Sequence, residues 1–217
     1  SAKNTNIDSS GGYIVGKDVD TDVGVVSGGK IESWEELTLR AKKAEKMESV
    51  RSGGNMNIQT QDKYTMTGQY YSGGEAVIRA TGGLEIAPEG KFEFNENLKV
   101  SSDTHIINRG LLSSLGKITV QAPEYIENRD SGRIYGAHVA IGTNYFLNTG
   151  GAVVNAAKRA DIGAETIKND SGAHIESLGT INIGRELDGN GVAFGQAKEL
   201  VNMYDAVIDA AGDLNID

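Results

Sequence analysis

The stretch IENRDSGRIYGAHVAI, residues 126–141, contains the pattern on which the fold of this 217-residue chain depends. An apolar residue lies two positions before Asn128, a turn containing Gly132 comes next, and the stretch ends in the alternating pair Val139 and Ile141. Alternation with a period of two is typical of a β-strand with one buried face. Each such unit therefore predicts short strands separated by a turn.

The same order recurs in IKNDSGAHIESLGTINI, residues 167–183, and its positions form columns along the chain. The asparagine column runs through Asn108, Asn128, Asn148, Asn169 and Asn202, with successive sequence steps of 20, 20, 21 and 33. Four apolar columns run beside it, the last with a one-residue slip at Ile134: Leu98, Ile118, Val139, Ala160, Ile181 and Leu214; Val100, Val120, Ile141, Ile162, Ile183 and Ile216; Ile106, Ile126, Phe146, Ile167 and Leu200; and Leu112, Ile134, Val154, Ile175 and Ile208.

A repeat of about 20 residues is shorter than helix-pair repeats, and the leucine spacing of leucine-rich repeats is absent. Two or three short strands for each turn of the chain fit this length better. Each coil would expose an apolar edge that only the next coil can bury. The sequence therefore predicts an all-β fold, a right-handed parallel β-helix (solenoid) with repeats of about 20 residues and ten or eleven coils.

The asparagine column has two expected structural roles. Asparagine tolerates the left-handed backbone conformation that a sharp corner requires. Stacked asparagines can also form hydrogen bonds from amide to amide along the solenoid. We therefore interpret Asn108, Asn128, Asn148, Asn169 and Asn202 as a structural column.

The first part of the chain repeats less regularly. Three Ser-Gly-Gly turns begin at Ser27, Ser52 and Ser72, at sequence steps of 25 and 20, so an insertion is expected in the first step. Residues 35–48 are open to two interpretations, a helix capped by Ser33 with Glu36 or a coil of the solenoid, and we favour a strand at 37–41.

The predicted organisation is a single repeat domain, residues 1–217. Residues 1–50 form irregular or N-terminal coils, 51–183 form regular coils, 184–199 form a lateral insertion, and 200–217 form a further coil. The insertion is placed by the sequence step from Ile183 to Leu200, which is 17, whereas the corresponding steps from Ile141 and from Ile162 are 5.

Composition narrows the classes of function. The net charge of −9 disfavours a nucleic-acid partner, which needs a clustered basic surface. No apolar run approaches the roughly 20 residues that span a bilayer, so membrane insertion is not expected. The chain has 29 glycines, 2 prolines and no cysteine, which suits many short strands and excludes thiolate metal sites.

No residue pattern predicts catalysis, a cofactor or a metal site. The columns beside the asparagines are not acidic, and His105, His138 and His174 do not share a repeat position. Asp18, Asp20 and Asp22 alternate on one strand face, which could hold calcium but is more typical of a solvated strand. We therefore expect that this chain is not an enzyme. The less favoured alternative is a carbohydrate-active β-helix enzyme, in which acidic side chains from different coils would meet to form the catalytic site.

The insertion is the best candidate for a role beyond scaffolding. It contains the tetrad Asp188, Gly189, Asn190 and Gly191, and insertions in solenoids often map to a binding face. A decorative loop is the other interpretation, and of the two we favour it. We expect the excursion to leave the rod laterally.

Residues 126–141, 169–179 and the ending AAGDLNI, residues 210–216, together resemble the repeat of filamentous haemagglutinin-like two-partner-secretion exoproteins. This family includes adhesins and the carriers of contact-dependent growth inhibition. The resemblance covers residues 50–217 well and the first 50 weakly. The Asn-Pro-Asn motifs of the family's secretion domain are absent, which implies an internal segment.

Membership would imply the shaft of a secreted protein on the surface of a Gram-negative bacterium, exported through an outer-membrane two-partner-secretion transporter. The implied function is cell adhesion, associated with virulence, and the possible partner is a protein or glycan receptor on a target cell. A receptor-binding segment of a contact-dependent inhibition toxin carrier is the alternative.

Overall fold

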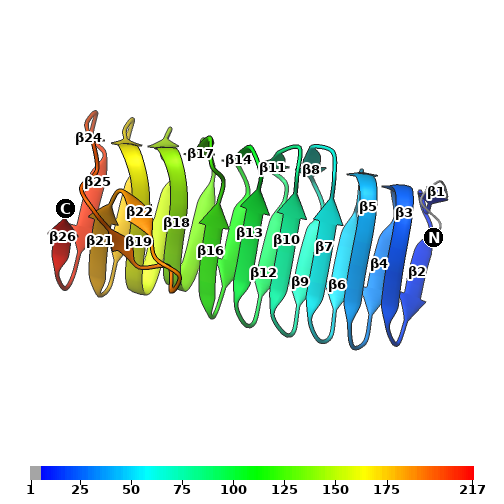
Figure 1. Cartoon of the computed structure of the whole chain (residues 1–217). Helices are drawn as coiled ribbons and strands as arrows, with labels where there is room; N and C mark the ends of the chain where they lie inside the picture. The colour runs from blue at the N-terminus through cyan, green and yellow to red at the C-terminus, as the bar shows by residue number, and fades with distance from the viewer. Residues whose placement is uncertain (1–5) are drawn as a thin grey trace.

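The computed structural model describes residues 6–217 and contains strands but no helix in that range. No described segment is therefore a helix long and apolar enough to cross a membrane. The strands stack in parallel into a solenoid of about nine turns with three faces, A, B and C (Figure 1). The chain passes from A to B to C in each turn and then returns to A one rung further along.

Each face is a parallel sheet. Face A contains β7 (Met56–Thr60), β10 (Ala76–Ala80), β13 (Leu98–Ser102), β16 (Lys117–Gln121), β21 (Thr180–Gly184) and β26 (Leu214–Ile216). It also contains the first parts of β3 (Val19–Ser27) and β5 (Leu37–Glu45), whose last residues bend onto face B. Face B contains β1 (Asn6–Asp8), β8 (Tyr64–Met66), β11 (Leu84–Ile86), β14 (His105–Asn108), β17 (Tyr125–Arg129) and β24 (Glu199–Asn202). Face C contains β2 (Tyr13–Gly16), β4 (Lys30–Ser33), β6 (Ser49–Ser52), β9 (Gln69–Ser72), β12 (Lys91–Phe94), β15 (Leu111–Ser114), β20 (His174–Ser177) and β25 (Val207–Ala210).

Two long strands, β18 (Arg133–Thr149) and β19 (Val153–Asn169), bend around all three faces. The remaining pair, β22 (Glu186–Leu187) and β23 (Ala193–Phe194), forms an antiparallel hairpin outside the solenoid. Nine successive pairings connect Val19 to Leu214 on face A, so ten rungs are stacked there, which agrees with the lower end of the expected ten or eleven coils.

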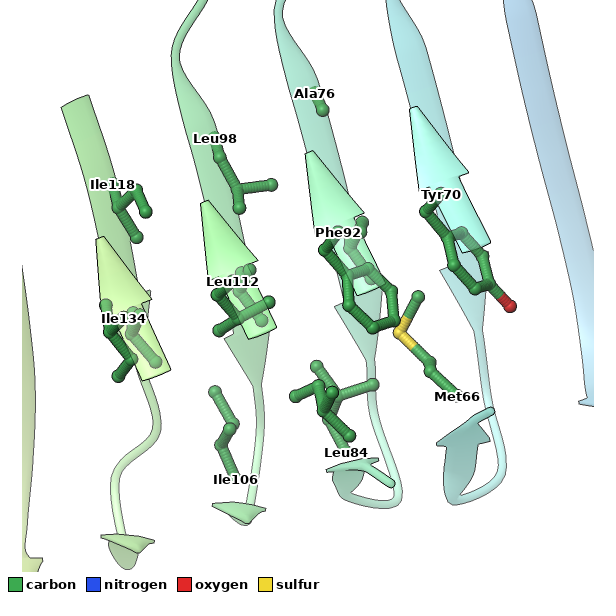
Figure 2. Packing of buried hydrophobic residues seen from close by; sticks show 14 of the residues in the cluster. Met66, Tyr70, Ala76, Leu84, Phe92, Leu98, Ile106, Leu112, Ile118 and Ile134 are labelled. Atoms are coloured by element: carbon green, nitrogen blue, oxygen red, sulfur yellow. The ribbon is translucent and has the colours of Figure 1, made fainter. Parts of the chain in front are cut away.

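The predicted apolar columns are confirmed residue by residue. Ile141 pairs in register with Val120 on one side and Ile162 on the other, and all three are buried. The one-residue slip at Ile134 is also confirmed, since Ile134 stacks on Leu112. Figure 2 shows inward side chains of successive coils lying one behind another and meeting those of the other faces in one continuous core.

Truncation of Ile141 to alanine is expected to lower the free energy of unfolding by about 2–5 kcal/mol, because it leaves a cavity between two coils. Urea denaturation followed by circular dichroism measures this loss. Val77→Ala is the matched control, since Val77 points outward from the same face and is 39% exposed. Equal destabilisation by both substitutions would contradict the assigned register.

The asparagine column is an amide ladder inside the corner between faces B and C. The Nδ2 atom of each asparagine donates to the Oδ1 atom of the next, at 2.8 Å in all four steps from Asn108 to Asn202. The side-chain nitrogen also reaches backbone carbonyls across the corner, as Asn148 does to His174 at 3.0 Å. The first four members of the column are buried and only Asn202 is exposed.

The expectation that these asparagines adopt the left-handed backbone conformation at the corner is wrong. No asparagine in residues 6–217 has a positive φ. The left-handed residues lie two positions later, at Asp130, Gly150, Ser171 and Tyr204. The asparagine itself must stay extended so that its amide points into the corner, and the residue after next makes the bend.

Asn148→Ala is expected to cost about 1–3 kcal/mol, because Asn128 loses its acceptor and Asn169 loses its donor inside the protein. Asn202→Ala should cost less, since Asn202 ends the ladder at the surface. Thermal or urea unfolding compares the two variants. A larger loss at Asn202 than at Asn148 would show that the ladder contributes little.

The N-terminal coils are more regular than the sequence indicated. Residues 37–41 are in strand β5, as favoured, and Leu37 stacks in register between Val19 and Met56. The grouping of Ser27 with Ser52 and Ser72 is wrong. Ser52 and Ser72 stack on Ser33, whereas Ser27 pairs with Glu45.

The grouping is wrong because Ser27 lies at a different corner of the solenoid from Ser52 and Ser72. Gly28 and Gly29 have positive φ values of 68° and 64°, whereas Gly53 and Gly54 do not. Two turns with the same residue types therefore make different bends, and the first step contains no insertion.

Candidate functional site

Two surface features lie outside the repeating framework, a hairpin on face A and a groove on face C. The hairpin comprises residues 185–198 and joins β21 to β24, which agrees with the predicted place of the insertion. The expectation that this segment projects laterally from the rod is wrong. The hairpin folds back over β18 and β19, where Figure 1 shows β22 crossing neighbouring rungs.

Three stacked glycines form the floor beneath the hairpin. Gly142, Gly163 and Gly184 succeed one another in register and point outward from face A. A Cβ atom on Gly163 would lie 2.4 Å from the backbone of Glu186, and one on Gly184 would lie 2.8 Å from that of Phe194. The hairpin backbone can approach the sheet this closely only because these side chains are absent.

A buried carboxylate anchors the hairpin to the sheet. Asp161 points outward from face A, yet it is only 1% exposed because the hairpin covers it. It accepts hydrogen bonds from Arg159 at 2.6 Å, from Asn182 at 2.8 Å and from the backbone amide of Ala193 at 3.2 Å. The covered charge is thus paired with a cation and held by further hydrogen bonds.

The ends of the hairpin converge on one half-buried carboxylate. Glu165 accepts from Lys198 at 2.6 Å and from Arg185 at 2.7 Å. The Lys198 hydrogen bond, reinforced by that of Arg185, lowers the pKa of Glu165 below its usual value.

The predicted binding tetrad forms the tip of the hairpin. The Asp188 carboxylate accepts from the backbone amides of Val192 and Asn190, and these bonds lower its pKa. The Asn190 carbonyl accepts from Lys117, while Gly191 is buried against face A. Asp188 and Gly191 therefore build and dock the turn, and of the four residues only Gly191 is buried.

Gly163→Ala is expected to loosen the hairpin, because the new methyl group collides with the Glu186 backbone. Trypsin should then cleave after Arg185 and Lys198 several times faster than in the parent protein. Gly189→Ala is the control, since its Cβ would meet no atom within 4 Å. Unchanged cleavage of Gly163→Ala would mean that the hairpin is not held against the glycine column.

The groove on face C runs along the outer surface of β15, β18, β19 and β20 and has a volume of about 830 Å³. Its floor holds outward side chains of successive coils, which include Tyr135, Asn155 and Glu176. One wall is the corner between faces C and A, where Leu115 is 75% exposed. This groove could not be predicted from the repeat, because the outward positions of face C show no recurring residue type.

Hydrogen bonds organise the polar floor of the groove. Glu176 accepts from the His174 ring at 2.8 Å when the Nδ1 atom carries a proton, and from Asn155 at 3.1 Å. Arg133 donates to the backbone carbonyls of Gly132 and Gly151 at 3.0 and 3.1 Å. The carboxylate and guanidinium groups therefore have defined positions before any ligand arrives.

The other residues considered from sequence do not gather into a site. Asp20 forms an ion pair with Arg40 at 2.5 Å, and Asp22 lies beside Arg40 on the next rung. Across residues 6–217, no group of three or more histidine, cysteine, aspartate or glutamate side chains is placed to hold a metal ion. The three histidines lie in different columns, as their spacing predicted.

No family model, curated protein or solved structure matches this chain.

Proposed function

We propose that this chain is a structural and adhesive shaft segment of a secreted bacterial surface exoprotein. The observation that supports this most strongly is the position of the two ends. The first described strand, β1, lies at one end of the rod and the last, β26, at the other, with unbroken coil-to-coil stacking between them (Figure 1). Compact domains often have neighbouring termini, whereas a shaft must hold its two flanking segments apart.

Rigidity is a consequence of the same stacking. Each coil adds a rise of about 4.8 Å, so nine steps separate the first and last rungs by about 43 Å. Close packing and the buried amide ladder resist bending between coils. A segment of this kind would hold a contact surface at a fixed distance from the cell.

Export and location belong to the same proposal. The resemblance of residues 126–141 to the haemagglutinin repeat supports export through an outer-membrane two-partner-secretion transporter and exposure outside a Gram-negative cell. The absence of cysteine is compatible with passage of an unfolded chain, which disulfides would hinder.

Display of the whole chain on a bacterial surface tests the proposal. A membrane anchor is fused before Ser1, and a dye is placed either beside Ser1 or after Asp217. Energy transfer to a membrane-bound acceptor should place the second dye farther out by about 40 Å, the length of the stacked rungs. Cells displaying the chain should also attach to other cells or matrix in greater numbers than cells with the anchor alone.

Equal dye heights would contradict the shaft function, and unchanged attachment would remove the adhesive part of the proposal.

A recognition role, as in the receptor-binding segment of a toxin carrier, is the second candidate, and the groove with its pre-ordered polar floor favours it. It predicts attachment to a narrow set of target cells that is lost when the floor is altered.

A further inference from the structure

We propose that the groove on face C binds a neutral, hydroxyl-rich glycan that lies along the rod axis. This inference rests on the proposed adhesive function, because it names the chemistry of the surface to which the shaft would attach. Five observations carry it: the backbone pairing, the polar groups of the floor, the charge of the groove, its length and its apolar wall.

The floor is a closed sheet with no backbone groups for a peptide. Tyr135, Asn155 and Glu176 lie on strands whose amides and carbonyls bond to the rungs before and after them. An added peptide strand gains affinity mainly by pairing its own backbone with a free edge, and this surface offers none. A ligand here must be held through side chains.

Those side chains suit hydroxyl groups. The Oε2 atom of Glu176 accepts from Asn155 and its Oε1 atom pairs with His174, which leaves a further lone pair on each oxygen available as an acceptor. Tyr135 is 37% exposed and offers both a phenolic hydroxyl and a ring face. Sugars present hydroxyl groups around a ring whose C–H faces are apolar, and this combination matches the floor.

The charge of the groove favours a neutral ligand. Its charged lining residues are Arg133 and Glu176, which offset one another, and His174 adds a charge only when it is protonated. The Nη1 atom of Arg133 already donates to two backbone carbonyls, and Glu176 offsets the guanidinium charge, so the groove offers a sulfate or carboxylate no net positive charge. The protein as a whole carries a net charge of −9, which repels polyanions further.

The dimensions also agree with an extended sugar chain. Ser113, Tyr135, Asn155 and Glu176 form one outward column on four successive rungs. Three steps of about 4.8 Å give roughly 14 Å, the length of about three pyranose rings in an extended chain. The apolar wall at Leu115, Ala137 and Ala157 runs beside this column and can cover sugar C–H groups.

The groove is suited to retain a glycan and not to hydrolyse one. Hydrolysis of a glycosidic bond ordinarily uses two carboxyl groups on opposite sides of the bond. Among the residues that line this groove, Glu176 is the only one with a carboxyl group. Bound glycan should therefore be recovered at its original length.

Native electrophoresis in gels that contain a soluble polysaccharide tests the inference with the full chain. The neutral probes are dextran, laminarin, galactomannan and mannan, and the anionic probes are dextran sulfate and polygalacturonate. The protein should be retarded by at least one neutral probe. Tyr135→Ala and Glu176→Gln should each weaken that retardation about tenfold, as expected for loss of a ring contact or a charged hydrogen bond.

Matched controls come from the outward surface of face B, where Tyr145→Ala and Glu127→Gln change the same residue types. Both should bind like the parent, and all four variants should unfold at the parent temperature. No retardation by any neutral probe, retardation by polyanions alone, or equal losses in the controls would each overturn the inference. A chain that fails this assay yet still separates the two dyes on the cell surface would leave the shaft function standing.

Discussion

Each coil of this protein exposes an edge that only another coil can cover, and the rest of the structure depends on that constraint. The edge combines an inward apolar row with unpaired backbone amides and carbonyls. Stacking of a second coil in register buries the apolar row and pairs the backbone amides and carbonyls at the same time. Side chains of similar size and shape must therefore recur at each inward position, as Ile141 and Ile162 do.

The same constraint leaves the outer faces free to diverge. Outward side chains contribute little to the stacking of coils. An outward position can therefore be a glycine, as at Gly163, or a polar residue, as at Glu176. The glycine column allows a hairpin to lie flat on face A, and the organised floor of face C forms a groove. Scaffold and contact surface thus use alternate residues of the same strands.

Periodicity explains how much could be predicted from the sequence. Inward residues repeat at a nearly constant step, so the register of Ile134 could be predicted despite its slip. Corners repeat less faithfully, because asparagine and glycine suit several turns. The left-handed residue is therefore Asp130 and not Asn128, and Ser27 belongs to a different corner from Ser52.

The length of the insertion is visible in the step from Ile183 to Leu200, but its docking on face A is not. A clue to that docking is present, since Gly142, Gly163 and Gly184 advance with the same step of 21 as the isoleucines beside them. The groove offers no comparable pattern, because it depends on which outward side chains and corners meet across four rungs.

Removal of one coil measures the central claim most directly. Deletion of residues 98–117 removes one whole coil and would place Ile118 on Ala76, so that every column closes in register. Deletion of residues 98–107 removes half a coil and places strands of one face against another. The account predicts that the first variant keeps the β circular dichroism spectrum and a cooperative melt, while the second loses both. Equal survival or equal collapse of the two would contradict it.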